Sequence, residues 1–204
     1  AAYEEKDETP FRFGSFTTMG ELYVETGLNE LRMSNYRRIL SLDSAMVVVQ
    51  FDKDGVQYQR KYFISYPDSV MVMKFTANQS GKQNLILSYC PNSEAKSNLR
   101  ADGKDGLVYT GVLDNNGMKF AFRIKAIHKG GTLEAENDRL IVKGADEVVF
   151  LLTADTDYKM NFNPDFKDPK TYVGNDPEQT TRIMMDQACL LYTSPSPRDK
   201  RQSR

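Results

Sequence analysis

Histidine and cysteine are scarce in this sequence of 204 residues, which holds one histidine and two cysteines. With His128 as its sole histidine, the chain offers no histidine-rich metal site and no spare base for a Ser-His-Asp triad. His128 stands at the end of AFRIKAIHKGG, just before a glycine turn, and is interpreted as an ordinary strand-end residue. Cys90 and Cys189 are far apart and belong to no paired motif, so they say little about the redox compartment.

The usual cofactor and metal motifs are missing as well. The sequence has no GxxxxGK[ST] loop and no GxGxxG after a strand, and neither CxxC nor HExxH occurs. DKDG at 52–55 resembles the start of a calcium-binding loop, but the later Glu that such a loop requires is absent, so a hairpin turn is the interpretation. The sequence therefore assigns no catalytic, cofactor-binding or metal-ligating residue and predicts no cofactor.

The chain also lacks a concentrated charge of one sign and a long apolar run. Its formal net charge is −1, and residues 1–188 carry 23 basic against 27 acidic residues once the basic C-terminal end is set aside. A nucleic-acid surface needs a concentrated basic field, and a membrane helix needs about 18 apolar residues in a row. We therefore expect no nucleic-acid partner and no membrane span.

What the sequence does contain is a series of strand-like segments separated by turns. AMVVVQF (45–51) and VQYQRKYFIS (56–65) flank Asp54-Gly55, and LVYTGVL (107–113) and MKFAFRIKAIH (118–128) flank Asn116-Gly117. Both dipeptides favour the positive-φ geometry of a tight hairpin. Similar segments follow at 68–77, 83–89, 132–136, 139–144 and 146–155.

Side-chain alternation within these segments predicts strands with one solvated side. In 118–128 the apolar positions are separated by charged residues, which are Lys119, Arg123 and Lys125. In 56–65 one face is formed by Val56, Tyr58, Arg60 and Tyr62 and the other by Gln57, Gln59, Lys61 and Phe63. Because strands recur about every ten residues with almost no helix between them, the sequence predicts an all-β fold, a large antiparallel sandwich, and disfavours a βαβ architecture.

A helix start is predicted after a Pro/Asn/Asp-rich loop at 156–175. Asp176 is suited to the N-cap and Pro177 to the first helical position, with Glu178 behind them. Ile183, Met184 and Gln187 would lie near one face, which predicts a partner surface for that face.

Residues that could carry chemistry are weighed against simpler roles. Turns and strand ends account for most carboxylates, and no acid/base pair stands out among them: Asp52, Asp54, Asp114, Asp138, Asp155 and Asp157. Aromatic residues near the start could line a sugar-binding surface or close the sandwich, and the second role is favoured: Phe11, Phe13, Phe16 and Tyr23. Three methionines on strands are interpreted as core filler: Met46, Met71 and Met73.

Two long stretches resemble a known family. They are FGSFTTMGELYVETG with NYRRILSLDSAMVVVQFDKDGVQYQRKYFISYPDSVMVMKFTA, and ADGKDGLVYTGVL with GMKFAFRIKAIHKGGTLEAENDRLIVKGADEVVFLLTADTDY. The matching elements are Gly20, Leu22, Tyr23, Tyr36, Arg37, Arg38, Leu40, Leu42, Asp43, Ala45, Asp54, Gly55, Lys61, Phe63, Ser65, Pro67, Asp68, Val70 and Val72. From about Phe11 to Ala188 the chain resembles the N-terminal domain of glycoside hydrolase family 95, the α-L-fucosidases.

The resemblance implies a multidomain parent protein. It would place an N-terminal β-supersandwich before an (α/α)6 barrel, the partner domain that would carry the two catalytic carboxylates of an inverting enzyme. The implied substrate is a glycan with terminal α-1,2-linked L-fucose, and the implied setting is a bacterial protein outside the cytoplasm. No catalytic residue transfers to this chain, and Arg37 and Arg38 are expected to pair with carboxylates inside the domain.

Two other functions stay open. The chain could be a free-standing carbohydrate-binding sandwich that presents Phe13 and Tyr23, or the N-terminal domain of another (α/α)6-barrel glycoside hydrolase acting on a different sugar. The three readings share the fold and differ in where the sugar chemistry takes place.

The last sixteen residues, CLLYTSPSPRDKRQSR, differ from the rest. CLLYTSPSPRD back-translates to a sequence that resembles a transposase-based sequencing adapter, so 189–204 is expected to be a non-native, disordered tail rather than a basic Ser/Pro arm. The expected organisation is a ragged lead-in at 1–10, the sandwich at 11–175, the start of a helix at 176–188, and this tail. The sandwich is expected to be truncated at both ends, because the opening strands of the family pattern do not precede Phe11.

Overall fold

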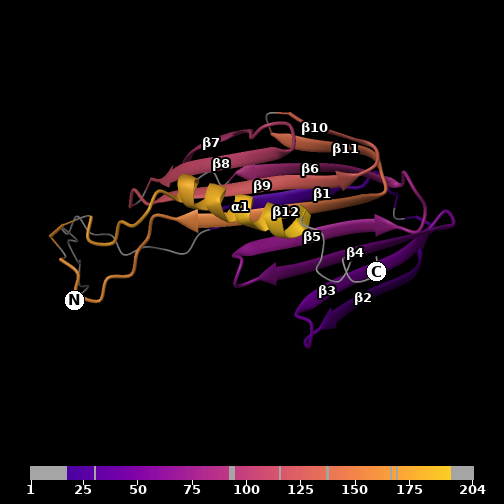
Figure 1. Ribbon diagram of the computed structural model, residues 1–204, viewed down its shortest axis with the longest axis horizontal. Coiled ribbons are helices and arrows are strands. Elements are labelled where there is room, and N and C mark those ends of the chain that lie inside the picture. Colours follow the sequence, from indigo (N-terminus) through magenta and orange to yellow (C-terminus); the bar gives the residue numbers. More distant parts are fainter. Residues whose placement is uncertain are drawn as a thin grey trace, which may run out of the picture.

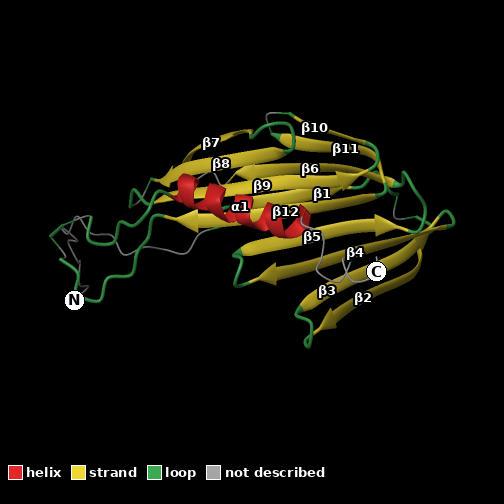
Figure 2. Cartoon of the chain, in the orientation of Figure 1, coloured by secondary structure: helices red, strands yellow, loops and turns green. Residues whose placement is uncertain are grey.

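The described part of the chain folds into two antiparallel sheets and one helix (Figures 1 and 2). The structure is a computed structural model that describes residues 18–29, 31–91, 95–114, 116–136, 138–165, 167–168 and 170–193. The larger sheet has the order β2 (Ser34–Ser41), β3 (Met46–Lys53), β4 (Val56–Ser65), β5 (Val70–Ala77), β12 (Glu147–Thr156), β9 (Lys119–Lys129), β8 (Gly106–Leu113), β7 (Ala95–Ala101). The smaller sheet has the order β1 (Gly20–Glu25), β6 (Gln83–Pro91), β11 (Arg139–Ala145), β10 (Thr132–Ala135). The all-β sandwich prediction is confirmed.

The hairpin between β3 and β4 shows how local sequence sets the register. Asp54 and Gly55 both have positive φ, 50° and 77°, as the two central residues of a type I′ turn require. The turn pairs Lys53 with Val56, and the register then places Phe51 opposite Tyr58, whose rings stack 5.3 Å apart. The hairpin interpretation of DKDG is therefore confirmed.

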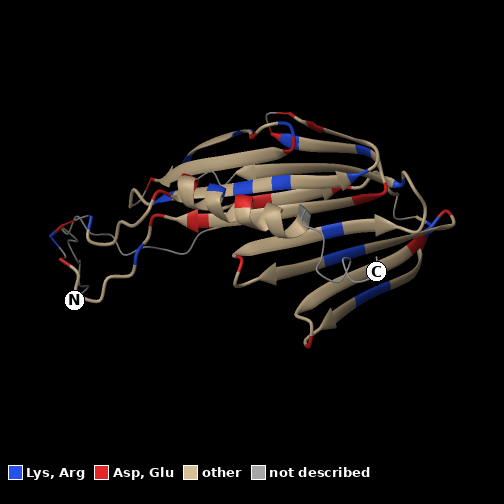
Figure 3. Cartoon of the chain, in the orientation of Figure 1, with Lys and Arg blue, Asp and Glu red and all other residues tan. Residues whose placement is uncertain are grey.

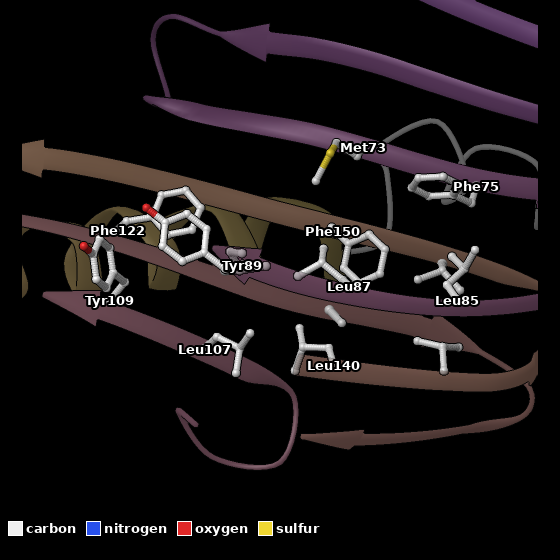
Figure 4. Close-up of a cluster of buried hydrophobic side chains, with 14 of the residues drawn as sticks. Met73, Phe75, Leu85, Leu87, Tyr89, Leu107, Tyr109, Phe122, Leu140 and Phe150 are labelled. Atoms are coloured by element: carbon white, nitrogen blue, oxygen red, sulfur yellow. The ribbon is translucent and has the colours of Figure 1, made fainter. Parts of the chain in front are cut away.

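The main hydrophobic core lies between the two sheets (Figure 4). Leu87 from the smaller sheet and Tyr109 and Phe150 from the larger one are fully buried. Burying one such side chain contributes about 1.5–3 kcal/mol to the free energy of folding. Because every second side chain of a strand points to the same face, each strand places several side chains in this core. The core therefore follows directly from the period-two pattern of the sequence.

The larger sheet extends past the smaller one at β4, β3 and β2 (Figure 1). Leu40, Val47, Tyr62 and Met73 form one cross-strand row, and Met73 belongs to the core, so the whole row faces inward. Among the described residues nothing covers the far end of this row, and Leu40 is 65% exposed. β1, the edge strand on that side, pairs only with β6 within the described chain.

Helix α1 (Pro177–Thr193) packs on the outer face of the larger sheet, over β12, β9 and β5. The start is as predicted, because Asp176 Oδ1 accepts a hydrogen bond from the Glu178 amide at 3.1 Å. The face predicted to have a partner surface is not the one that packs on the sheet. Ile183 and Gln187 are exposed, and the face on the sheet is instead formed by Pro177, Thr181, Met185 and Ala188. These positions are spaced by four, four and three residues and so follow one helical stripe.

The expectation that β9 is solvated on its outer side is wrong, because α1 covers part of that side. Arg123 lies on that side but is 3% exposed. Its register neighbour Thr153 donates a hydrogen bond to the Thr181 carbonyl of the helix at 3.1 Å, so the helix backbone covers this row. Alternation within one strand reports the two faces of a sheet but not whether a helix covers one of them.

Three strands and one boundary differ from the sequence prediction. β1, β2 and β7 were not expected from the pattern alone; all three are edge strands, and the side chains of β2 are mostly exposed. The helix continues to Thr193, beyond the expected limit at 188, and Cys189 packs against the cluster beneath it. Residues 1–17 and 194–204, which include the lead-in and most of the expected tail, lie outside the described residues.

Candidate functional site

A groove lies where β7, β8 and β9 meet the start of α1. It measures about 410 Å³. Its lining residues are Lys96, Ser97, Asn98, Thr110, Gly111, Val112, Lys119, Phe120, Asp176, Pro177 and Glu178. Two carboxylates and two lysines in one groove raise the question of whether it performs acid/base chemistry.

Both carboxylates of this groove already have structural partners. Glu178 Oε1 lies 2.6 Å from Arg100 Nη2 of β7. Asp176 caps the helix through its contact with the Glu178 amide. An inverting glycosidase needs one carboxylic acid to protonate the leaving oxygen and one carboxylate to activate water. The Glu178 carboxylate is paired with a guanidinium, and the Asp176 carboxylate caps the helix N-terminus. We therefore interpret the groove as the place where α1 is attached to the sheet and not as an acid/base site.

Several other acidic residues lie in turns or hold strand ends together. Asp157 is buried and accepts a hydrogen bond from the Lys119 amide at 2.9 Å, which ties the end of β12 to β9. Asp102 binds the buried guanidinium of Arg123. Asp54 lies in the β3–β4 turn, and Asp138 and Arg139 are 3.2 Å apart in the turn before β11. The prediction that turns and strand ends account for the carboxylates fits these contacts.

No metal site is formed by the described part of the chain, in which no three His, Cys, Asp or Glu side chains gather. His128 lies at the exposed end of β9, with Nδ1 2.8 Å from the Gly130 carbonyl. Its interpretation as an ordinary strand-end residue matches this position. No helix in residues 18–193, within the described ranges, has the length and apolar character needed to cross a membrane.

The aromatic surface considered from the sequence is not assembled among the described residues. Phe11, Phe13 and Phe16 lie outside them. Tyr23 stands on the exposed side of β1, where its hydroxyl donates a hydrogen bond to the Glu21 carboxylate. That contact raises the pKa of Tyr23.

The two arginines of the family-like motif behave differently from the expectation. Arg37 and Arg38 are exposed on β2, and neither forms an ion pair with a carboxylate of the described chain. They sit on opposite faces, since Arg38 pairs with the inward Val49 and Arg37 with Gln50. The expected pairing within the domain is therefore wrong for the described part of the chain.

The methionines lie where the pattern predicts. Met73 is buried in the main core, Met71 packs against it, and Met46 begins β3. The core prediction is confirmed for Met73 and Met71, whereas Met46 is partly buried and belongs to none of the core clusters of the described residues.

Sequence reasoning missed a cluster of exposed apolar residues in the loop between β12 and α1. Tyr158, Met160 and Phe162 occur at every second position there. This spacing was visible in the sequence, but the surrounding Pro, Asn and Asp residues marked the segment only as a loop.

These features define an all-β sandwich domain with one packed helix and no catalytic constellation among its described residues. The chain belongs to the family described as "Glycosyl hydrolase family 65, N-terminal domain", whose model matches residues 2–161. The resemblance to a glycoside hydrolase N-terminal domain is thereby confirmed at the level of glycoside hydrolases.

Two curated relatives are named as fucosidases. The chain is 28% identical over 181 residues to "Probable alpha-fucosidase A" of Aspergillus niger, which covers 83% of this chain and 22% of that protein. It is 23% identical over 167 residues to "Alpha-L-fucosidase 2" of Arabidopsis thaliana, covering 70% of this chain and 20% of that protein. The chain thus spans about a fifth of the length of the curated relatives it matches.

A solved structure shares the fold. It is titled "Putative kojibiose phosphorylase from human microbiome", with a TM-score of 0.53, 10% sequence identity, and coverage of 88% of this chain and 26% of that one. At this identity the likeness concerns the arrangement of strands.

Proposed function

We propose that the chain is the N-terminal β-sandwich domain of a family 95 α-L-fucosidase, an inverting enzyme that removes terminal α-1,2-linked L-fucose from glycans. The observation that carries the proposal is the 28% identity to a protein named as an α-fucosidase over 83% of this chain. A second fucosidase, from a plant, matches 70% of it. The family-like motifs from Phe11 to Ala188 support the same assignment.

In this proposal the chemistry belongs to a downstream (α/α)6 barrel, and the sandwich supports it. The carboxylates of the described chain are engaged in capping, ion pairs and turns, as at Asp176, Glu178 and Asp102. The chain alone is therefore expected to be inactive on fucosides. An extracytoplasmic, bacterial setting is part of the same proposal.

A second candidate is the N-terminal domain of an enzyme that acts on another sugar. The family model and the phosphorylase of similar fold favour it, since both point to family 65. The two candidates differ in the reaction of the parent enzyme, because one hydrolyses a fucoside and the other transfers a glycosyl group to phosphate.

The deciding experiment starts with the genomic DNA beyond codon 188, which would also test whether 189–204 is adapter-derived. The full gene product is then assayed with an α-1,2-fucosyl galactoside in water and with kojibiose and inorganic phosphate. Release of fucose by the full protein and none by residues 1–188 supports the first candidate. Phosphate-dependent cleavage of kojibiose without fucose release overturns it in favour of the second, and fucose release by residues 1–188 alone overturns the placement of the chemistry.

A further inference from the structure

The loop between β12 and α1 forms two arms that are hydrogen-bonded to each other. The Gly174 amide donates to the Asp157 carbonyl at 2.5 Å, and the Lys159 amide donates to the Tyr172 carbonyl at 2.7 Å. The Tyr158 and Tyr172 rings stack 5.9 Å apart between the arms. These bonds define the shape of the loop, whose base is anchored to β9 through the Lys119–Asp157 contact, and Figure 1 shows it extending beyond the ends of the strands.

The loop presents an apolar patch, which we define as Tyr158, Met160, Phe162 and Val173. The exposed fractions are 51% for Tyr158, 59% for Met160, 93% for Phe162 and 52% for Val173. Isolated apolar side chains are normal on a protein surface, but adjoining ones on a projecting loop mark an interaction site. Of these four residues Phe162 has the largest exposed fraction, so a partner that covers the patch would bury the greatest part of this side chain.

Three polar side chains of the loop, those of Asn161, Asp165 and Asp168, form hydrogen bonds inside it. Asn161 Nδ2 donates to both the carbonyl and the hydroxyl of Thr171 at 3.1 Å. Asp165 accepts from the Lys167 amide and Asp168 from the Lys170 amide, each at 2.9 Å. Sugar recognition needs free polar groups placed beside an aromatic face, whereas a protein interface has an apolar centre. Charge does not favour a nucleic acid or an anion either, since basic and acidic residues are interspersed over the molecule (Figure 3).

The position of the patch relative to α1 is fixed. Val173 precedes the first helical residue, Pro177, by four positions, and the first turn of the helix is held to the sheet by the Arg100–Glu178 ion pair at 2.6 Å. Thr153 holds the next turn through the Thr181 carbonyl. The patch therefore lies next to the anchored start of the helix, at this end of the domain.

We propose that this apolar patch is the docking surface for a further domain of the same polypeptide, with Phe162 inserted into an apolar pocket of that domain. The inference rests on the proposed function, in which the chain is part of a longer protein. Its occupant is chosen because the chain spans 22% and 20% of its curated relatives, so most of the length of those relatives lies outside the matched region. An apolar patch of this kind, beside polar side chains that are partly engaged within the loop, fits an apolar protein surface better than a glycan.

Thiol labelling of the full-length gene product tests the contact. Phe162→Cys is made in a Cys90→Ser background, and the rate of alkylation is compared with that of Leu31→Cys. Leu31 is a matched control because it is 71% exposed and its carbonyl accepts a hydrogen bond from Lys53, at the opposite end of the larger sheet from the loop. Both variants change exposed side chains and leave the core intact.

We expect alkylation of Phe162→Cys to be at least tenfold slower in the full-length protein than in the 204-residue chain, with Leu31→Cys changed by less than twofold. Equal rates for Phe162→Cys in the two proteins would overturn the proposal. Slow labelling only after a fucosylated glycan is added would also overturn it, by assigning the patch to the substrate. The fucoside assay tests the proposed function separately. If the full-length protein releases fucose but Phe162→Cys is alkylated rapidly, only the docking surface is rejected. If the full-length protein does not release fucose but Phe162→Cys is alkylated slowly, only the fucosidase assignment is rejected.

Discussion

The guanidinium of Arg100 on β7 lies 2.6 Å from the carboxylate of Glu178 in the first turn of α1, joining the edge of the larger sheet to the helix. The two residues are 78 positions apart in the sequence. The carboxylate also stands at the positive end of the helix dipole, which adds to the attraction. This contact is the main charged link between the helix and the sheet edge among the described residues.

Replacing Glu178 with Gln should loosen the start of α1 without unfolding the sandwich. Both side chains are partly exposed, so solvent screens the pair and the expected loss is about 0.5–1 kcal/mol. Hydrogen exchange of the helix amides, measured beside urea denaturation, should show faster exchange in the first turns. A double-mutant cycle with Arg100→Ala is the control, and additive losses would show that the contact contributes nothing.

Removing the partner of the buried Arg123 should be far more costly. Asp102→Ala leaves a guanidinium that is 3% exposed without its carboxylate; because the Asp102 side chain is itself 36% exposed, we expect a cost of about 2–3 kcal/mol, below the range of about 3–5 kcal/mol for fully buried pairs. Urea denaturation gives the change in the free energy of unfolding. Arg123→Met in the Asp102→Ala background should recover part of the loss, because the buried charge is gone. A loss below 1 kcal/mol for Asp102→Ala would contradict this role of the pair.

Shortening a leucine side chain should lower the stability much more where the inner face of the sandwich is covered than where it is uncovered. Leu87→Ala removes a side chain with 0% exposure and should cost about 2–5 kcal/mol. Leu40→Ala, at a position 65% exposed, should cost about 0.5 kcal/mol or less in this chain. The comparison is made by thermal and urea unfolding of both variants. A large loss for Leu40→Ala would mean that other parts of the chain cover this end of the row.

Alkaline pH should destabilise the fold through Tyr89. Burial, with a smaller effect of Tyr109 and Cys90, raises the pKa of Tyr89 well above its ordinary value, and its hydroxyl donates to the Met19 carbonyl. The folded protein thus holds this proton more tightly than the unfolded chain. The resulting stability is complete below about pH 10 and falls as the pH rises further.

Tyr89→Phe should make this alkaline loss shallower while costing about 1 kcal/mol at neutral pH for the missing hydrogen bond. Urea midpoints measured between about pH 7 and pH 11 test both effects. Tyr66→Phe, at a side chain that is 93% exposed, is the control for removal of a phenol that is not buried. An unchanged alkaline slope in Tyr89→Phe would refute the assignment to Tyr89.

Most of the strands were predictable because their causes are local. Asp54-Gly55 supplies the turn geometry, and the alternation in 56–65 places Tyr58 and Tyr62 on the core side. The helix start was predictable for the same reason, since Asp176 and Pro177 act on their own neighbours. β7 was missed because an exposed edge strand is held by backbone pairing with β8, which leaves little mark on side-chain pattern.

The sequence by itself determined the class of fold, the hairpin registers, the helix cap and the absence of a recognisable catalytic motif, since each depends on residues close together in the chain. Only the tertiary structure decided that Arg123 is buried, that the contact face of α1 contains Met185 rather than Ile183, and that Phe162 projects into solvent. Burial depends on which elements meet, and here α1 meets strands that precede it by many residues. One-dimensional periodicity identifies the faces of an element, but only packing selects which face is covered.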